Sequence, residues 1–203
     1  MKIGIAGYSG SGKTSAASYL CDTIDCELID GDVEAKVIMN SNDSIKRKIK
    51  ASFGPACVIN NTIDFKTLSD QVFRSVSELR ALNSIVHPQL IAHLKERIEQ
   101  SKCKNVILDA ALIPLWNAER WFDQCVWISA SKDVRLERLK KKIPTLPEGM
   151  IINRLTIQES LFSPTSDELW TVIENNSYFG YLKKRLDEFY RSVIKSDKVR
   201  YNK

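Results

Sequence analysis

Hydrophobic residues fall into five short runs that are typical of buried strands. They are bounded by glycine, charged residues or turn residues, and they lie at Ile3–Ala6, Glu27–Ile29, Lys104–Asp109, Gln124–Ser129 and Trp170–Glu174. Val and Ile are frequent in these runs, and such continuous apolar segments indicate strands that are covered on both faces. The pattern predicts five strands of one parallel sheet.

Longer segments with helical character separate the strands. We expect helices at about 13–24, 133–142 and 178–195, another beginning near Met150, and a mainly helical stretch from Val33 to Gln100. That stretch is predicted to break near Phe53-Gly54-Pro55 and again at His87-Pro88, where proline would begin a new helix after a capping residue. Strands that alternate with helices indicate an α/β protein with three layers.

The composition is that of an ordinary globular protein. The chain has 203 residues, of which 43% are hydrophobic and 27% charged, and this balance excludes a disordered chain. A net charge of +5 is too small to argue for a nucleic-acid partner. No apolar run is long enough to span a membrane. We therefore expect neither nucleic acid nor membrane among its partners.

The five cysteines are spaced too widely for a zinc site, because no CxxC pair occurs among them. Their number is odd, and the chain starts directly with the strand-like run Lys2–Ala6 rather than with a secretory or transit peptide. These features predict reduced thiols and a cytoplasmic location.

One motif carries most of the chemistry that the sequence predicts. Residues 7–14 match the phosphate-binding pattern G-x-x-x-x-G-K-[ST] without a gap, with a predicted strand before them and a predicted helix after them. Gly10 and Gly12 would let the backbone approach a phosphate closely, and successive N–H groups would form an anion-binding nest at the helix N-terminus. The motif predicts a P-loop kinase that uses ATP.

The side chains of this P-loop have distinct predicted roles. Lys13 would reach the outer phosphates, and the Thr14 hydroxyl would ligate Mg²⁺. The neighbouring residues Ser11 and Ser15 complete the predicted nucleotide site, together with Gly10 and Gly12.

Two acidic residues follow the second predicted strand, in the segment Asp30-Gly31-Asp32. Ligands of open α/β sheets bind outside the carboxyl ends of the strands, so these acids would orient a hydroxyl, accept its proton or assist the metal. A turn followed by a helix N-cap explains the same residues without any catalytic role. The spacing alone does not separate the two interpretations.

Asp109 ends the third predicted strand and is a candidate magnesium ligand that acts through water. An acidic residue at a strand-ending turn is the alternative explanation. The basic segment 135–142, followed by Arg154, has the features of a mobile lid that brings arginines over the phosphates, and its position after the fourth strand favours this over a solvated helix face.

The ordered set of motifs resembles the dephospho-CoA kinase family over nearly the whole chain, from Ile3 to about Leu186. Beyond the P-loop, the resemblance depends on six segments: Leu28–Asp32, Phe53-Gly54-Pro55, Asp64–Phe73, His87-Pro88, Arg135–Lys142 with Arg154 and Gln158, and Glu174–Ser177. It implies a five-stranded core at about 1–32, 104–135 and 165–203, a helical substrate-binding region at 33–103 and a small lid at 136–164.

The resemblance also implies roles for individual residues in phosphate transfer to the ribose 3′-hydroxyl of dephospho-CoA. Asp32 would be the general base or would orient the hydroxyl, with Asp30 beside it. Arg138 and Arg154 would stabilise the transferred charge, and Asn176 would lie beside the adenine of ATP. His87 would lie near the acceptor.

Two departures from the family pattern affect the expected acceptor site. Tyr8 replaces the usual glycine and would place a bulky side chain near the acceptor or nucleotide, and Ala111–Leu115 lacks the usual acidic residue. A nucleoside or nucleoside-monophosphate kinase therefore remains an alternative, as does a nucleotide-binding protein without turnover. We expect a small-molecule acceptor and a monomer or weak homo-oligomer.

Overall fold

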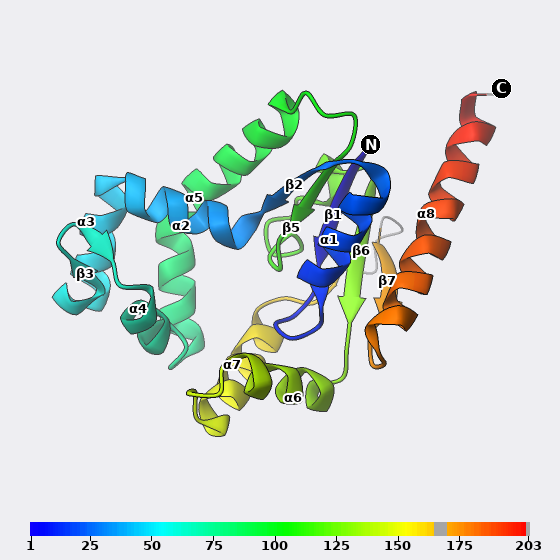
Figure 1. Ribbon diagram of the computed structural model, residues 1–203. Helices are drawn as coiled ribbons and strands as arrows, with labels where there is room; N and C mark the ends of the chain where they lie inside the picture. The colour runs from blue at the N-terminus through cyan, green and yellow to red at the C-terminus, as the bar shows by residue number, and fades with distance from the viewer. Residues whose placement is uncertain (165–169, 202–203) are drawn as a thin grey trace.

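A five-stranded parallel sheet organises the chain, as predicted. The structure is a computed structural model that describes residues 1–164 and 170–201. In spatial order, the strands are β2 (Glu27–Asp30), β5 (Val106–Asp109), β1 (Lys2–Ala6), β6 (Gln124–Ser129) and β7 (Trp170–Glu174) (Figure 1). The predicted strand at Lys104–Asp109 begins two residues later than expected, at Val106.

Helices cover both faces of the sheet, which gives the three layers. Side chains alternate along each strand, so Ile3 and Ile5 of β1 pack under α1 (Lys13–Ile24) and α8 (Phe179–Tyr201). Ala6 belongs to the second core, on the opposite face, which contains residues of α5 (Val76–Gln100). The double covering explains why the strands are apolar at nearly every position.

The helical region after β2 consists of four helices and a small hairpin. They are α2 (Gly31–Ser41), α3 (Asp43–Phe53), α4 (Phe65–Val72) and α5, with the hairpin strands β3 (Val58–Ile59) and β4 (Thr62–Ile63) between α3 and α4. The predicted break at Phe53-Gly54-Pro55 is confirmed, because α3 ends at Phe53 and a 3-10 helix, η1, follows at Pro55–Cys57.

The segment between β6 and β7 contains two helices, α6 (Lys132–Lys142) and α7 (Glu148–Leu161). A second 3-10 helix, η2 (Glu119–Trp121), precedes β6. The predicted boundaries of core, helical region and lid remain predictions, and residues 165–169 and 202–203 of the predicted core lie outside the described residues. No helix in the described part of the chain is long and apolar enough to cross a membrane.

The predicted helix break at His87-Pro88 is wrong, because α5 continues through Pro88. Proline inside a helix lacks the N–H that would bond the carbonyl four residues earlier, here that of Ser84, and costs about 3 kcal/mol. Val86 and Leu90 are buried on either side of Pro88, and their packing offsets this cost. The helix instead changes direction along its length (Figure 1).

The prediction that all cysteines are reduced is also wrong, because Cys21 and Cys26 form a disulfide. Helix α1 ends at Ile24, and Asp25 adopts a left-handed conformation (φ 51°) that turns the chain back towards β2. The turn brings the two Cα atoms to 5.0 Å, within the usual range for a disulfide. Cys57, Cys103 and Cys125 form no disulfide.

We expect Ile107→Ala to lower the free energy of unfolding by about 2–5 kcal/mol, because Ile107 is fully buried in the centre of the sheet and alanine leaves a cavity. Val172→Ala is the matched control on edge strand β7, where the side chain is 56% exposed. Urea denaturation measures both variants. Equal losses of stability would contradict the described packing.

Candidate active site

The P-loop joins the central strand β1 to α1, which begins at Lys13. Gly10 and Gly12 adopt left-handed backbone angles, with φ of 80° and 95°. A Cβ atom on Gly10 would lie 2.8 Å from the carbonyl oxygen of Arg135, and one on Gly12 would overlap Asn175 Nδ2. Glycine is therefore required at both positions by conformation and by close approach of neighbouring atoms.

Two carbonyl groups of the P-loop are held by side chains from distant parts of the sequence, Arg138 of α6 and Asn175 after β7. Arg138 Nη1 donates to the carbonyls of Gly10 (3.2 Å) and Ser11 (3.3 Å), and Asn175 Nδ2 donates to Ser11 O (2.7 Å). Arg138 Nη2 also donates to the carbonyls of Asn175 (2.9 Å) and Ser177 (3.3 Å). Arg138 therefore connects the P-loop to the segment that follows β7.

Asn175, next to the predicted residue Asn176, contacts the P-loop and was not singled out from the sequence. The side chain of Asn175 is buried against the P-loop, whereas Asn176 Oδ1 accepts from the Ser131 N–H (2.7 Å) before α6. Two adjacent asparagines cannot be told apart by type. Their positions along the strand could have separated them, because adjacent side chains at the end of a strand point in opposite directions and only one of the two can face the P-loop.

Lys13, Thr14 and Asp109 meet at the carboxyl edge of the sheet. Lys13 Nζ lies 3.2 Å from Asp109 Oδ1, and Asp109 is 2% exposed. Burial raises the pKa of Asp109, against the opposing effects of the Lys13 charge and a hydrogen bond from Thr14. Asp30 on β2 stands in register with Asp109 and raises that pKa further.

This group has the chemistry of a magnesium site that is completed by phosphates. Asp109 Oδ1 is buried and faces the Lys13 ammonium without a well-aligned hydrogen bond, beside the Thr14 side chain. Among the described residues, no three His, Cys, Asp or Glu side chains gather to hold a metal. Mg²⁺ commonly takes one or two carboxylates and completes its shell with substrate phosphates and water, so the residues present fit it.

The structure separates the two acidic residues after β2. Asp30 is the N-cap of α2, and its Oδ1 accepts from the N–H groups of Asp32 (2.9 Å) and Val33 (3.1 Å). Asp32 lies in the first turn, is exposed, and has no side-chain hydrogen bond or ion pair within the described part of the chain. Asp30 therefore accounts for the capping interpretation, and the carboxylate of Asp32 is available to a ligand.

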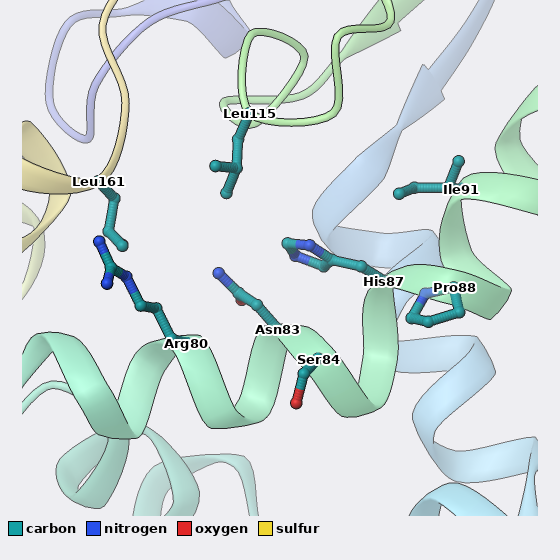
Figure 2. Close-up of a pocket in the computed structure, with 8 residues that line it drawn as sticks. All are labelled: Arg80, Asn83, Ser84, His87, Pro88, Ile91, Leu115 and Leu161. Carbon is teal, nitrogen blue, oxygen red and sulfur yellow. The ribbon is translucent and has the colours of Figure 1, made fainter.

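Two cavities lie beside α5. The smaller, of about 180 Å³, is lined by Asp32, Trp116 and mostly apolar side chains, including Met39 and Leu112. The larger, of about 400 Å³, lies between Arg80, Asn83, Ser84 and His87 of α5 and the opposing Leu115 and Leu161 (Figure 2). Asn83 and His87 line both cavities, so the two adjoin at these side chains, and we refer to them together as the recess.

His87 is held by Trp116 within this recess. The indole Nε1–H of Trp116 donates to His87 Nδ1 at 3.2 Å, and the rings meet edge to face with their centroids 5.6 Å apart. Burial lowers the pKa of His87 to about 4, so its imidazole is neutral near pH 7. Trp116 follows the divergent segment Ala111–Leu115, and its contact with His87 was not predicted from the sequence.

Tyr8 lines neither cavity. Its hydroxyl donates to Phe162 O (2.7 Å), and its ring meets Trp127 edge to face at 5.0 Å. The guanidinium of Arg135 lies 5.0 Å from the centre of the same ring. The structure thus places the bulky residue of the P-loop against Phe162, which follows α7, and outside the lining of both cavities.

Arg154 lies away from the P-loop, against the helical region. Its Nη2 pairs with Asp70 Oδ1 at 3.2 Å, and its guanidinium stacks 4.8 Å from the centre of the Phe73 ring. Gln158, one turn further along α7, instead contacts the P-loop, since its Oε1 accepts from the Ser9 N–H at 2.7 Å. Helix α7 therefore touches both the helical region and the nucleotide site.

Comparison with known proteins places this geometry in a family context. The family model described as "Dephospho-CoA kinase" matches residues 1–177. The protein named dephospho-CoA kinase from Fusobacterium nucleatum is 30% identical over 197 residues, which cover 95% of this chain and 98% of that protein. The one from Chlamydia abortus is 28% identical over 197 residues, covering 95% and 96%.

Solved structures share the fold. The crystal structure of TT1252 from Thermus thermophilus has a TM-score of 0.68 at 23% identity, covering 95% of this chain and 97% of that one. The structure of dephospho-CoA kinase from Campylobacter jejuni has a TM-score of 0.59 at 18% identity, covering 97% and 100%. The predicted three-layer α/β architecture is confirmed by these likenesses.

We expect Asn175→Ala to weaken ATP binding about tenfold or more, because the substitution leaves the Ser11 carbonyl without its shortest hydrogen bond and loosens the P-loop. Asn176→Ala removes a contact with Ser131 instead and should weaken ATP binding less. Calorimetric titration with ATP compares the two dissociation constants. A larger loss in Asn176→Ala would show that the wrong asparagine has been assigned to the loop.

Proposed function

The chain belongs to the dephospho-CoA kinase family, and we propose that it transfers the γ-phosphate of ATP to the ribose 3′-hydroxyl of dephospho-CoA, which gives coenzyme A. One observation carries the proposal. The exposed carboxylate of Asp32 lines the smaller cavity, near the carboxyl ends of the parallel strands. The P-loop and the Lys13–Asp109 pair follow the carboxyl ends of neighbouring strands of the same sheet. A nucleotide site and an acceptor site thus share one edge of the sheet, as phosphoryl transfer requires.

The nucleotide would be held mainly by backbone N–H groups of residues 10–15 at the N-terminus of α1. When ATP binds, the Lys13 ammonium would leave Asp109 and pair with the outer phosphates instead. Its side chain would need to move only a short way, because Asp109 lies beside the same loop. Thr14 and, through water, Asp109 would hold Mg²⁺. The ion would neutralise charge on the β- and γ-phosphate oxygens when bound.

The acceptor hydroxyl would bind at Asp32. Asp30 orders the first turn of α2 by accepting two backbone N–H groups, which fixes the backbone that carries Asp32. The carboxylate of Asp32 would orient the 3′-hydroxyl towards the γ-phosphate and accept its proton during transfer. Positioning the hydroxyl is the larger part of this role, because the transition state of phosphoryl transfer needs little covalent assistance.

The two arginines would act differently. Arg138 keeps the P-loop in shape through its bonds to loop carbonyls, and its charge would act on the phosphates from behind the loop. Arg154 has a buried Nε atom without a hydrogen bond, and burial lowers its pKa. We place Arg154 over the transferring phosphate only after α7 moves and the Asp70 pair opens, as lid closure does in small kinases.

The proposed function also suggests where the enzyme acts and what it binds. We propose a cytoplasmic enzyme with small-molecule partners only, acting as a monomer or weak homo-oligomer. Cytoplasmic thiols are kept reduced, so the Cys21–Cys26 bond would form there only transiently.

The first test is ADP release with Mg-ATP and a panel of acceptors. We expect saturable turnover with dephospho-CoA and little or none with adenosine, AMP, CMP or pantetheine, because the recess extends well beyond the space of a nucleoside. Faster turnover of AMP or CMP would replace the proposal with a nucleoside-monophosphate kinase. ATP binding without ADP release for any acceptor would indicate a binding protein.

We expect Asp32→Asn to lower kcat about 10²- to 10⁴-fold while the KM for ATP changes little, because Asp32 acts on the acceptor hydroxyl and not on the nucleotide. Asp22→Asn on the exposed side of α1 is the control and should behave as the wild-type chain. Initial rates at saturating dephospho-CoA measure the effect. An unchanged kcat would show that Asp32 has no catalytic role and only contributes to the first turn of α2.

A further inference from the structure

The imidazole of His87 occupies the junction of the two cavities. Figure 2 shows His87 and Asn83 projecting from α5 into the space that faces Leu115. His87 lines both cavities, so any ligand that extends from Asp32 into the larger cavity passes this side chain.

The hydrogen bond from Trp116 determines which nitrogen of His87 carries the proton. An indole Nε1–H only donates, so His87 Nδ1 at 3.2 Å must accept. A neutral imidazole with an accepting Nδ1 carries its proton on Nε2. Burial keeps the ring neutral, since it lowers the pKa of His87 to about 4. His87 thus presents a fixed Nε2–H donor to the recess.

This donor has no partner within the described part of the chain. The only hydrogen bond of His87 recorded there is the one at Nδ1, and the Asn83 amide has none. A half-buried N–H that faces a cavity selects a ligand atom that accepts a hydrogen bond and disfavours one that donates.

The position of Asp32 indicates which part of the acceptor reaches His87. If the ribose 3′-hydroxyl lies at Asp32, the base attached to the same ribose is the nearest bulky group. The walls of the smaller cavity, which include Met39, Leu82 and Leu112, are apolar and suit a flat ring better than a diphosphate. Adenine offers ring-nitrogen acceptors to His87, and its amino group suits the amide oxygen of Asn83.

We propose that the smaller cavity receives the adenine base of the acceptor, and that the His87 Nε2–H, in a tautomer fixed by Trp116, donates to a ring nitrogen of that base. The inference rests on the proposed function for the identity of the ligand, and on the Trp116–His87 contact alone for the tautomer. His87 acts as a specificity residue, and Trp116 as the positioning residue that acts through it.

The tautomer is tested by ¹⁵N NMR of the imidazoles without substrate. The chain has only two histidines, and His93→Gln leaves His87 as the single signal. His93 lies outside both cavities and contacts Glu34, so this variant is also the kinetic control. We expect one tautomer, protonated on Nε2, in the wild-type chain and a mixture in Trp116→Phe. A wild-type imidazole protonated on Nδ1 would overturn the proposal.

The contact with the base is tested by kinetics of the same variants. Trp116→Phe and His87→Leu should raise the KM for dephospho-CoA about 2- to 12-fold, which is the range of one hydrogen bond, with kcat and the KM for ATP changed less than about twofold. His87→Gln keeps a donor and an acceptor and should restore part of the loss. His93→Gln should match the wild-type chain.

Deaza analogues of dephospho-CoA identify the accepting atom. Replacing the accepting ring nitrogen by carbon should raise the KM of the wild-type chain and leave that of His87→Leu unchanged. An unchanged KM in both Trp116→Phe and His87→Leu would overturn the assignment of the base. Absence of turnover by the wild-type chain would instead refute the proposed function, and the adenine assignment with it, while the ¹⁵N spectrum still decides the tautomer.

Discussion

A loop that points its N–H groups at a phosphate must point carbonyl groups back into the protein, and these carbonyls need donors. Much of the architecture around residues 7–14 meets this requirement. Arg138 arrives from α6 and Asn175 from the end of β7, and together they supply the hydrogen bonds of Gly10 and Ser11. The edge strand β7 and helix α6 therefore support the P-loop, although neither needs to touch a nucleotide.

The sheet and its P-loop could be predicted because their signals are local. Five apolar runs and one unbroken motif specify the strands, their buried faces and the edge where ligands bind. The family resemblance was confirmed as well, since it depends on ordered short segments. One failure came where distant residues decide the outcome, since packing carries α5 through Pro88. The other is local, because the left-handed conformation of Asp25 brings Cys21 to Cys26 and residue type alone does not predict it.

The residue types of the site could be predicted from the sequence, but the role of each individual residue could not. Asp30 and Asp32 are identical in chemistry, and only the direction of each side chain makes one a helix cap and leaves the other free. The same holds for Asn175 and Asn176 at the end of β7. The contact between Trp116 and His87 joins residues 29 positions apart, so no local pattern indicates it.

Because α5 bends at Pro88, a small change of angle there would move the N-terminal end of the helix by a larger distance. Twelve residues separate Val76 from Pro88, an arm of about 18 Å at 1.5 Å per residue. A rotation of about 5° at the proline would displace the far end by about 1.5 Å, which is enough to break a hydrogen bond. That end follows Phe73, whose carbonyl accepts from Asn153 of α7 at 2.6 Å. A small rotation beside His87 would therefore cause a larger displacement at the contact with α7, in proportion to the length of this part of α5.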